Sequence, residues 1–99
     1  MRGYHFSDYK PDDSQRGGFN ELLNLFTQLL NYTAGDAGDA LAWMNELDKQ
    51  YKLTNNEYAM GDFIDDLKDK GYITESPTNG EISITAKTEN KIPVRGPFM

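Results

Sequence analysis

Residues Phe63–Ile73 read FIDDLKDKGYI, and the periodicity of the chain changes inside this stretch. Up to Lys70 the apolar residues recur at helical spacing, with Met60, Phe63, Ile64 and Leu67 on one face. Gly71 follows, and glycine is the residue that most readily takes the left-handed conformation ending a helix. Beyond it, residues 72–75 are rich in β-formers. The stretch therefore predicts a helix that passes through a glycine directly into a strand.

Downstream, the sequence predicts a β-hairpin. Residues 72–75 (YITE) and 81–85 (EISIT) read as two strands. The segment 76–80 (SPTNG) joins them, and its Asn-Gly pair favours a tight hairpin turn. Residues 86–92 are expected to form a short last helix, which Pro93 stops.

Upstream, two further helices are predicted. Residues 19–32 (FNELLNLFTQLLNY) carry apolar side chains at i, i+3, i+4 and i+7, and Gly35 is placed to cap the end of this helix. Asp36 is a suitable N-cap for the next helix, residues 37–52. The pattern Thr54-Asn55-Asn56-Glu57 matches a capping box, so the third helix is expected to span residues 55–70.

Three helices followed by a hairpin is the element order of a winged-helix domain. The sequence thus predicts an α+β fold, with a winged-helix-like domain over residues 19–92. Residues 1–18 are read as an N-terminal arm, whose aromatic side chains either tuck onto the domain or bind a partner, and residues 93–99 as a loose tail. The expected core comprises Leu22, Phe26, Leu41, Leu47, Phe63, Ile64, Leu67 and Ile84.

Composition narrows the class of protein. The chain has 99 residues, of which 37% are hydrophobic, and it has no cysteine. This excludes a disulfide framework and any thiolate metal site, and it suits a reducing cytoplasm. No apolar run reaches the length of a signal peptide core or of a membrane span. We therefore expect a soluble, cytoplasmic protein without a membrane partner.

The net charge of −6 is concentrated in the middle of the chain. Residues 36–71 hold nine acids and four bases, which accounts for −5 of the total. On a helical wheel Asp62, Asp65, Asp66 and Asp69 share one arc of roughly 100° opposite the apolar face. In a winged helix this face would enter the major groove of DNA, where carboxylates would repel the phosphates. The charge therefore argues against nucleic acid as a partner.

The sequence is compatible with three interpretations of the acidic face: a solvated surface, a docking face for a basic protein partner, or a site for a divalent cation. As a plain surface, Asp62→Asn and Asp66→Asn should leave stability unchanged or slightly raised, because each change relieves a like-charge pair.

Other candidate sites are few. Trp43 lies off the centre of the second helix's apolar stripe, so it is either a tryptophan at the edge of the core or an exposed interface anchor. The single histidine, His5, lies in the predicted arm, and the serines lack a nucleophile motif. We predict no catalytic residue, no metal ligand and no cofactor.

A resemblance to a known family rests on residues 35–73, with the helices ALAWMNELDKQY and NEYAMGDFIDDL, and on the ending ISITAKTENKI. The chain resembles the N-terminal segment of bacterial von Willebrand factor A-domain proteins, which are related to the chelatase-like partners of AAA-type ATPases. The resemblance covers residues 4–92. It implies an accessory module before a metal-binding domain, or a stand-alone relative of one. The metal motif of that domain, aspartate-x-serine-x-serine, is absent here, since residues 12–16 (DDSQR) match only its first half. The likeness ends near Ile92, so the chain is expected to be either a truncated piece or a naturally short version.

From these observations we expect a non-enzymatic protein–protein interaction or accessory module. The alternative is a winged-helix domain of the transcription type that contacts DNA through the wing, the arm or a dimer. Lys87, Lys91 and Arg95 are the only cations near the wing that could do so.

Overall fold

The computed structural model describes residue 11 and residues 13–91 of the chain. Within them the fold is α+β, as predicted: four α-helices and a two-stranded antiparallel sheet. A short 3₁₀ turn, η2 (Asp13–Gln15), precedes α1 (Phe19–Tyr32), α2 (Ala37–Tyr51) and α3 (Met60–Asp69). The strands β1 (Ile73–Glu75) and β2 (Ile82–Ile84) follow, and α4 (Ala86–Glu89) comes last.

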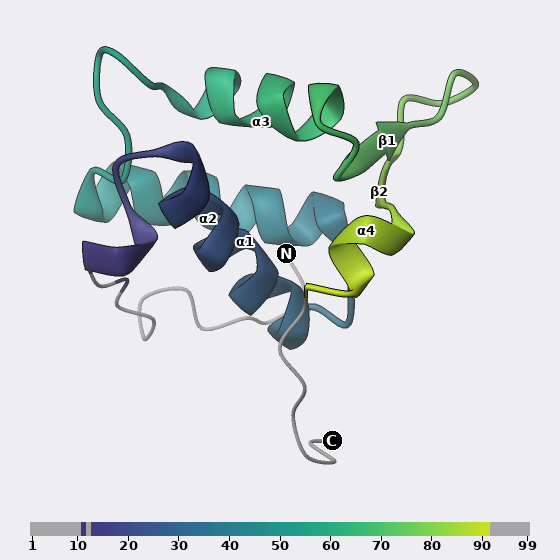
Figure 1. Ribbon diagram of the computed structural model, residues 1–99, viewed down its shortest axis with the longest axis horizontal. Coiled ribbons are helices and arrows are strands. Elements are labelled where there is room, and N and C mark those ends of the chain that lie inside the picture. Colours follow the sequence, from purple (N-terminus) through teal and green to yellow (C-terminus); the bar gives the residue numbers. More distant parts are fainter. Residues whose placement is uncertain (1–10, 12, 92–99) are drawn as a thin grey trace.

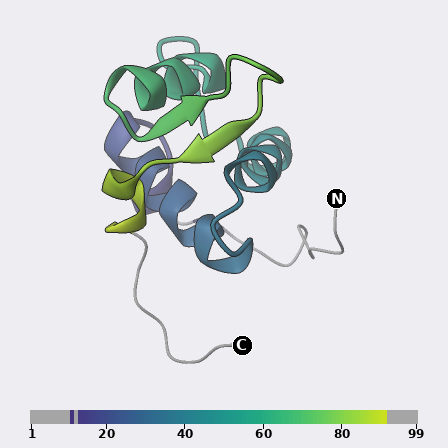
Figure 2. The ribbon, with the colours of Figure 1, turned by 90° about the vertical axis from the view of Figure 1, so that its right-hand side faces the viewer.

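Figure 1 shows α3 lying above α1 and α2, with the hairpin at the C-terminal end of α3 and α4 beneath it. Helix α1 contacts η2, α2 and α3, while β2 contacts α2 and α4. Turning the molecule shows the two strands side by side, with α2 close to the hairpin (Figure 2). None of the helices in the described ranges has the length and apolar character that crossing a membrane requires.

The first two helices begin and end as the sequence predicts, to within one residue. Gly35 N–H donates to the Leu30 carbonyl at 2.8 Å and closes the end of α1, with both Ala34 and Gly35 at positive φ. Asp36 then caps α2, because its Oδ1 accepts from the Asp39 N–H at 3.0 Å. The short Ala34-Gly35 turn forces α2 to fold back against α1.

The start of α3 differs from the prediction, and the capping box at 54–57 does not form. The hydroxyl and the N–H of Thr54 both donate to Asp48 Oδ1, at 2.9 and 3.0 Å, and the Glu57 N–H that a capping box would direct at the Thr54 hydroxyl donates to Asn55 instead. Asn55 Oδ1 accepts from the N–H groups of Glu57 and Tyr58, both at 2.8 Å, which folds 55–58 into a turn. The helix therefore begins five residues late, at Met60.

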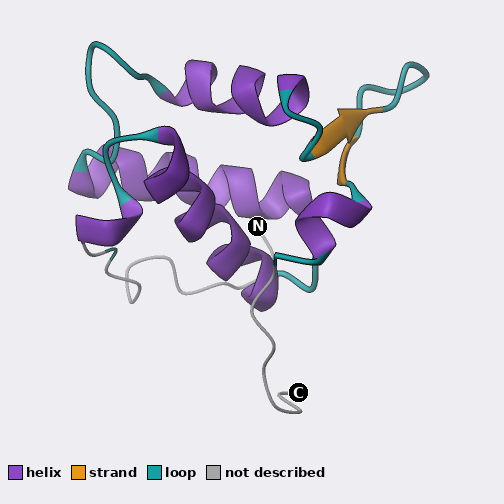
Figure 3. Ribbon diagram, in the orientation of Figure 1, coloured by secondary structure: helices purple, strands orange, loops and turns teal. Residues whose placement is uncertain are grey.

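The hairpin forms as predicted, with Ile73 paired to Ile84 and Glu75 to Ile82. Each strand is slightly shorter than expected, and Gly80 adopts φ +73 in the turn, where residues other than glycine are strained. Short helix α4 ends at Glu89. Figure 3 shows how little of the fold is strand compared with helix.

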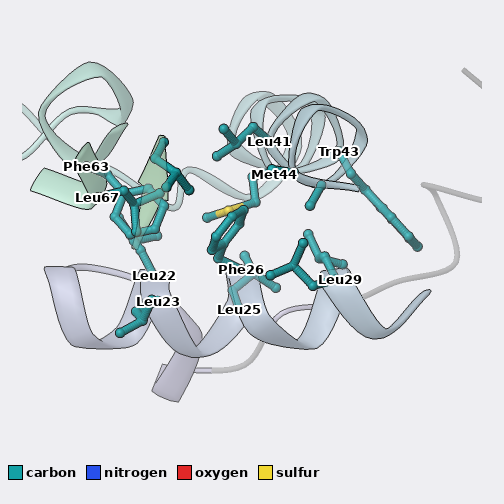
Figure 4. Close-up of a cluster of buried hydrophobic side chains, with 14 of the residues drawn as sticks. Leu22, Leu23, Leu25, Phe26, Leu29, Leu41, Trp43, Met44, Phe63 and Leu67 are labelled. Atoms are coloured by element: carbon teal, nitrogen blue, oxygen red, sulfur yellow. The ribbon is translucent and has the colours of Figure 1, made fainter. Parts of the chain in front are cut away.

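The core lies between α1, α2 and α3 (Figure 4). Six of the eight predicted core residues are buried: Leu22, Phe26, Leu41, Leu47, Phe63 and Leu67. Ile64 and Ile84 are the exceptions. Both are only half-buried and pack against the rim of the core, because one flanks the apolar face of α3 and the other lies on a sheet of only two strands.

Part of the predicted arm packs on the domain. Gln15 is buried, and Gly17 N–H donates to the Leu53 carbonyl at 3.0 Å. The guanidinium of Arg16 donates to the carbonyls of Tyr51 and Pro11, at 3.3 and 3.0 Å. The arm aromatics at positions 4, 6 and 9, and the tail 93–99, lie outside the described residues.

Leu67 gives a direct test of this core. Its side chain is fully buried, so Leu67→Ala should lower the free energy of unfolding by roughly 2–5 kcal/mol. Half-buried Ile64→Ala should cost clearly less. Urea unfolding followed by circular dichroism measures both, and equal losses for the two variants would mean that the face of α3 is misassigned.

Candidate functional site

The solvent face of α3 carries the four predicted aspartates. Asp62, Asp65 and Asp69 are exposed and Asp66 is half-buried, while Phe63 and Leu67 on the opposite face are buried. Although the helix begins later than expected, its face is oriented as the wheel predicted. The four carboxylates nevertheless differ in what they contact.

Asp62 supports the start of α3. Ala59 occupies the N-cap position, and its side chain has no atom that can accept a hydrogen bond. Asp62, three residues later, accepts from the Ala59 N–H through Oδ2 at 3.0 Å. Its negative charge also lies in the first turn, where the helix dipole stabilises anions. Asp62 is therefore a structural residue.

Asp66 holds the preceding loop against the helix. The Tyr58 hydroxyl donates to Asp66 Oδ2 at 2.6 Å. Burial raises the pKa of the Tyr58 hydroxyl well above its usual range, and the hydrogen bond to Asp66 and the nearby charges of Asp66 and Asp62 raise it further. The phenol therefore stays protonated, and the pair fastens residues 55–58 to α3.

The carboxylates of Asp65 and Asp69 make no hydrogen bond or ion pair with any other described residue. The lysine between them in sequence, Lys68, is engaged elsewhere: its ammonium lies 3.0 Å from Glu75 Oε1 on β1. These two neighbouring exposed carboxylates, one helical turn apart, are the part of the acidic face that the fold itself does not use.

Trp43 is 5% exposed, and its ring packs on Tyr32 with the centroids 5.9 Å apart. Figure 4 shows it at the edge of the buried cluster, at the end away from Phe63 and Leu67. This agrees with a core tryptophan. The reading as an exposed interface anchor is not supported by this conformation, in which the side chain is covered.

The cation reading of the acidic face finds no geometric support. Among residue 11 and residues 13–91, no three His, Cys, Asp or Glu side chains are grouped so that they could hold a metal ion. Asp62 and Asp66 are already directed at Ala59 and Tyr58. His5 lies outside the described residues.

Two features were missed by sequence reasoning. One is an open pocket of about 390 Å³ between residues 35–38, at the start of α2, and residues 81–84 on β2. The other is a group of three lysines, Lys70, Lys87 and Lys91, over the rings of Phe19 and Tyr72. Lys87 and Lys91 were already noted as cations near the wing, but Lys70 is far from them in sequence, and only the docking of α4 beside the end of α3 brings it to them.

No protein-family model, curated protein or solved structure matches the chain. The resemblance to von Willebrand factor A-domain proteins stays a prediction from the sequence.

Because Asp62 and Asp66 make structural contacts and Asp65 and Asp69 do not, variants at these positions should differ in stability. Asp62→Ala removes a helix cap and should cost about 1 kcal/mol, and Asp66→Ala should cost about as much by leaving the Tyr58 hydroxyl without its acceptor. The expectation of unchanged stability for Asp62→Asn and Asp66→Asn stays a prediction, since the asparagine side-chain oxygen can still accept both hydrogen bonds. Asp65→Ala and Asp69→Ala should be neutral or slightly stabilising, since they relieve like-charge repulsion at no structural cost. Urea unfolding of the four variants measures this, and four equal effects would contradict the division.

The Tyr58–Asp66 bond predicts a dependence of stability on alkaline pH. The pKa of Tyr58 is higher in the folded state than its ordinary value near 10. Above about pH 10 the unfolded state loses this proton first, so it binds fewer protons and stability falls as pH rises. Wild type should therefore lose more stability than Tyr58→Phe between about pH 9 and 11. If the unfolding free energies of wild type and Tyr58→Phe fell equally with rising pH, the Tyr58–Asp66 bond would not be the cause of the alkaline loss of stability.

Proposed function

We propose that the chain is a non-enzymatic protein-interaction module that docks a basic partner on the solvent face of α3. The observation that carries this proposal is the pair Asp65 and Asp69, two exposed carboxylates that no described residue engages. Exposed charges of this kind steer the encounter with an oppositely charged surface and fix its orientation. Docking of this sort is salt-sensitive because solvent screens the charges.

The proposal includes a winged-helix arrangement. Its support is the element order, three helices and then an antiparallel hairpin, with α3 in the position of a reading helix. By the sequence resemblance, the chain would act as an accessory module that precedes a von Willebrand factor A-type domain or works beside one. The absence of cysteine favours a cytoplasmic setting for such a module.

The alternative is a winged helix that contacts DNA, and one observation favours it. Lys70, Lys87 and Lys91 lie together beside the hairpin, as a phosphate-binding surface would require. Against it stand the net charge of −6 and the carboxylates on the helix that would enter the groove. Lys70 directly follows Asp69, so a long polyanion bound at the lysines would run close to the acidic face.

Asp65→Asn/Asp69→Asn tests the docking proposal without disturbing the fold. We expect unchanged thermal unfolding but weaker capture of basic partners from lysate of the cells that naturally make the protein. Binding of an isolated partner should lose mainly association rate, several-fold at low salt, and the difference should shrink near about 0.5 M salt.

The matched control is Glu46→Gln/Glu57→Gln, which removes the same charge from other exposed positions. The same partners, bound equally by wild type and by the double α3 variant at low salt, would leave the acidic face as plain surface. Mixed-sequence duplex DNA in the same assay tests the alternative: binding that weakens with salt and disappears in Lys87→Glu/Lys91→Glu would favour DNA.

A further inference from the structure

A cationic patch borders the acidic face. It consists of the lysines Lys70, Lys87 and Lys91, which overlie two aromatic rings. The Lys70 ammonium lies 5.3 Å from the centre of the Phe19 ring, and those of Lys87 and Lys91 lie 4.4 and 5.9 Å from the centre of the Tyr72 ring. We call this the lysine patch.

The lysine patch has no acidic counterpart in the described part of the chain. The ion pairs recorded there are Lys49 with Glu46 and Lys68 with Glu75, and neither involves the patch. In a chain with six more acids than bases, these three lysines form a positive region that no recorded ion pair neutralises. Such a region attracts an anionic surface from outside the molecule.

The lysines are held by the fold. The Lys87 ammonium donates to the Lys70 carbonyl at 2.8 Å. Helix α4 is fastened to the end of α3, because the Thr85 hydroxyl donates to the Gly71 carbonyl at 2.7 Å and the buried Thr88 hydroxyl donates to the Tyr72 carbonyl. The patch therefore keeps a fixed position relative to α3 and needs little reordering to bind.

We propose that the lysine patch docks the acidic face of a second copy of this chain. Two sets of charges lack an oppositely charged partner within the described residues: the lysines of the patch, and Asp65 with Asp69. They meet at the C-terminal turn of α3, where Asp69 and Lys70 are consecutive. A two-fold axis passing near this turn sets each patch against the acidic face of the other copy, so the contact is made twice and the assembly closes as a dimer.

A second copy suits the patch better than a nucleic acid does. A short acidic helix face presents a few carboxylates and then ends, whereas a duplex extends its phosphates past the patch toward Asp65 and Asp69. The dimer does not depend on the proposed basic partner, although it would cover the same aspartates. The interface consists mainly of exposed charges, so it is weak and sensitive to salt.

A charge-exchange experiment tests the dimer. Variant one is Lys87→Glu/Lys91→Glu and variant two is Asp65→Lys/Asp69→Lys, both in the full chain. At about 50 mM salt, where net repulsion between copies is largely screened, wild type should sediment with a concentration-dependent shift toward a dimer. Each variant alone should stay monomeric, because its own contacts become repulsive. An equimolar mixture of the two should associate again, since both contacts are then between opposite charges.

A control variant separates the effect of losing the lysine patch from the effect of changing the net charge. Lys49→Glu/Lys52→Glu lowers the charge of −6 by the same four units as variant one, but on α2 and at its end. It should associate like wild type, and about 0.5 M salt should dissociate wild type, control and mixture alike. Circular dichroism confirms that each variant is folded.

Three outcomes would overturn the proposal: wild type that remains monomeric at about 50 mM salt up to millimolar concentration, single variants that associate as well as wild type, or a mixture that does not associate. Monomeric wild type whose binding to duplex DNA is abolished by Lys87→Glu/Lys91→Glu would assign the patch to nucleic acid instead. Neither result bears on capture of a basic partner, which the asparagine variants test separately.

Discussion

The burial of helix α1 constrains the rest of the molecule. Its fully or almost fully buried side chains, Leu22, Leu25, Phe26, Leu29 and Leu30, point in several directions around the helix axis. A helix that is apolar over so much of its circumference must be covered on several sides. Contacts with η2, α2 and α3 provide that cover. The acidic helix α3 is held in place by the same requirement, because Phe63 packs edge-on against Phe26 with the ring centres 6.2 Å apart.

The end of α3 joins this helical core to everything that follows. Gly71 takes a left-handed conformation, and Tyr72 N–H donates to the Leu67 carbonyl at 2.8 Å. The Tyr72 carbonyl then accepts from the N–H and hydroxyl of Thr85 and from the hydroxyl of Thr88. One buried position thus connects α3, the hairpin and α4. The acidic face and the lysine patch consequently form parts of a single rigid unit.

Local signals in the sequence predicted what depends on local chemistry. The stripes of α1 and α2, the Asp36 cap, the left-handed Gly71 and the hairpin turn all involve residues a few positions apart. The predicted start of α3 was wrong because the Asn55 side chain accepts the Glu57 N–H that the capping box would have directed at Thr54. The orientation of the acidic face followed from the helical wheel, but the roles of Asp62 and Asp66 depend on Ala59 and Tyr58, and the lysine patch depends on tertiary docking between α3 and α4.

The four aspartates of α3 differ in whether a structural contact offsets the free-energy cost of placing aspartate on the helix. Aspartate is a poor helix former, and Asp65 and Asp69 repel each other one turn apart. Asp69 is the last residue of α3, where the helix dipole disfavours negative charge. For Asp62 and Asp66 the contacts with Ala59 and Tyr58 offset comparable costs. Asp65 and Asp69 gain no such contact, and residues that break a local rule without structural compensation are where a binding role is expected. On this argument the C-terminal half of α3, where these aspartates adjoin Lys70, is the surface on which function should be sought first.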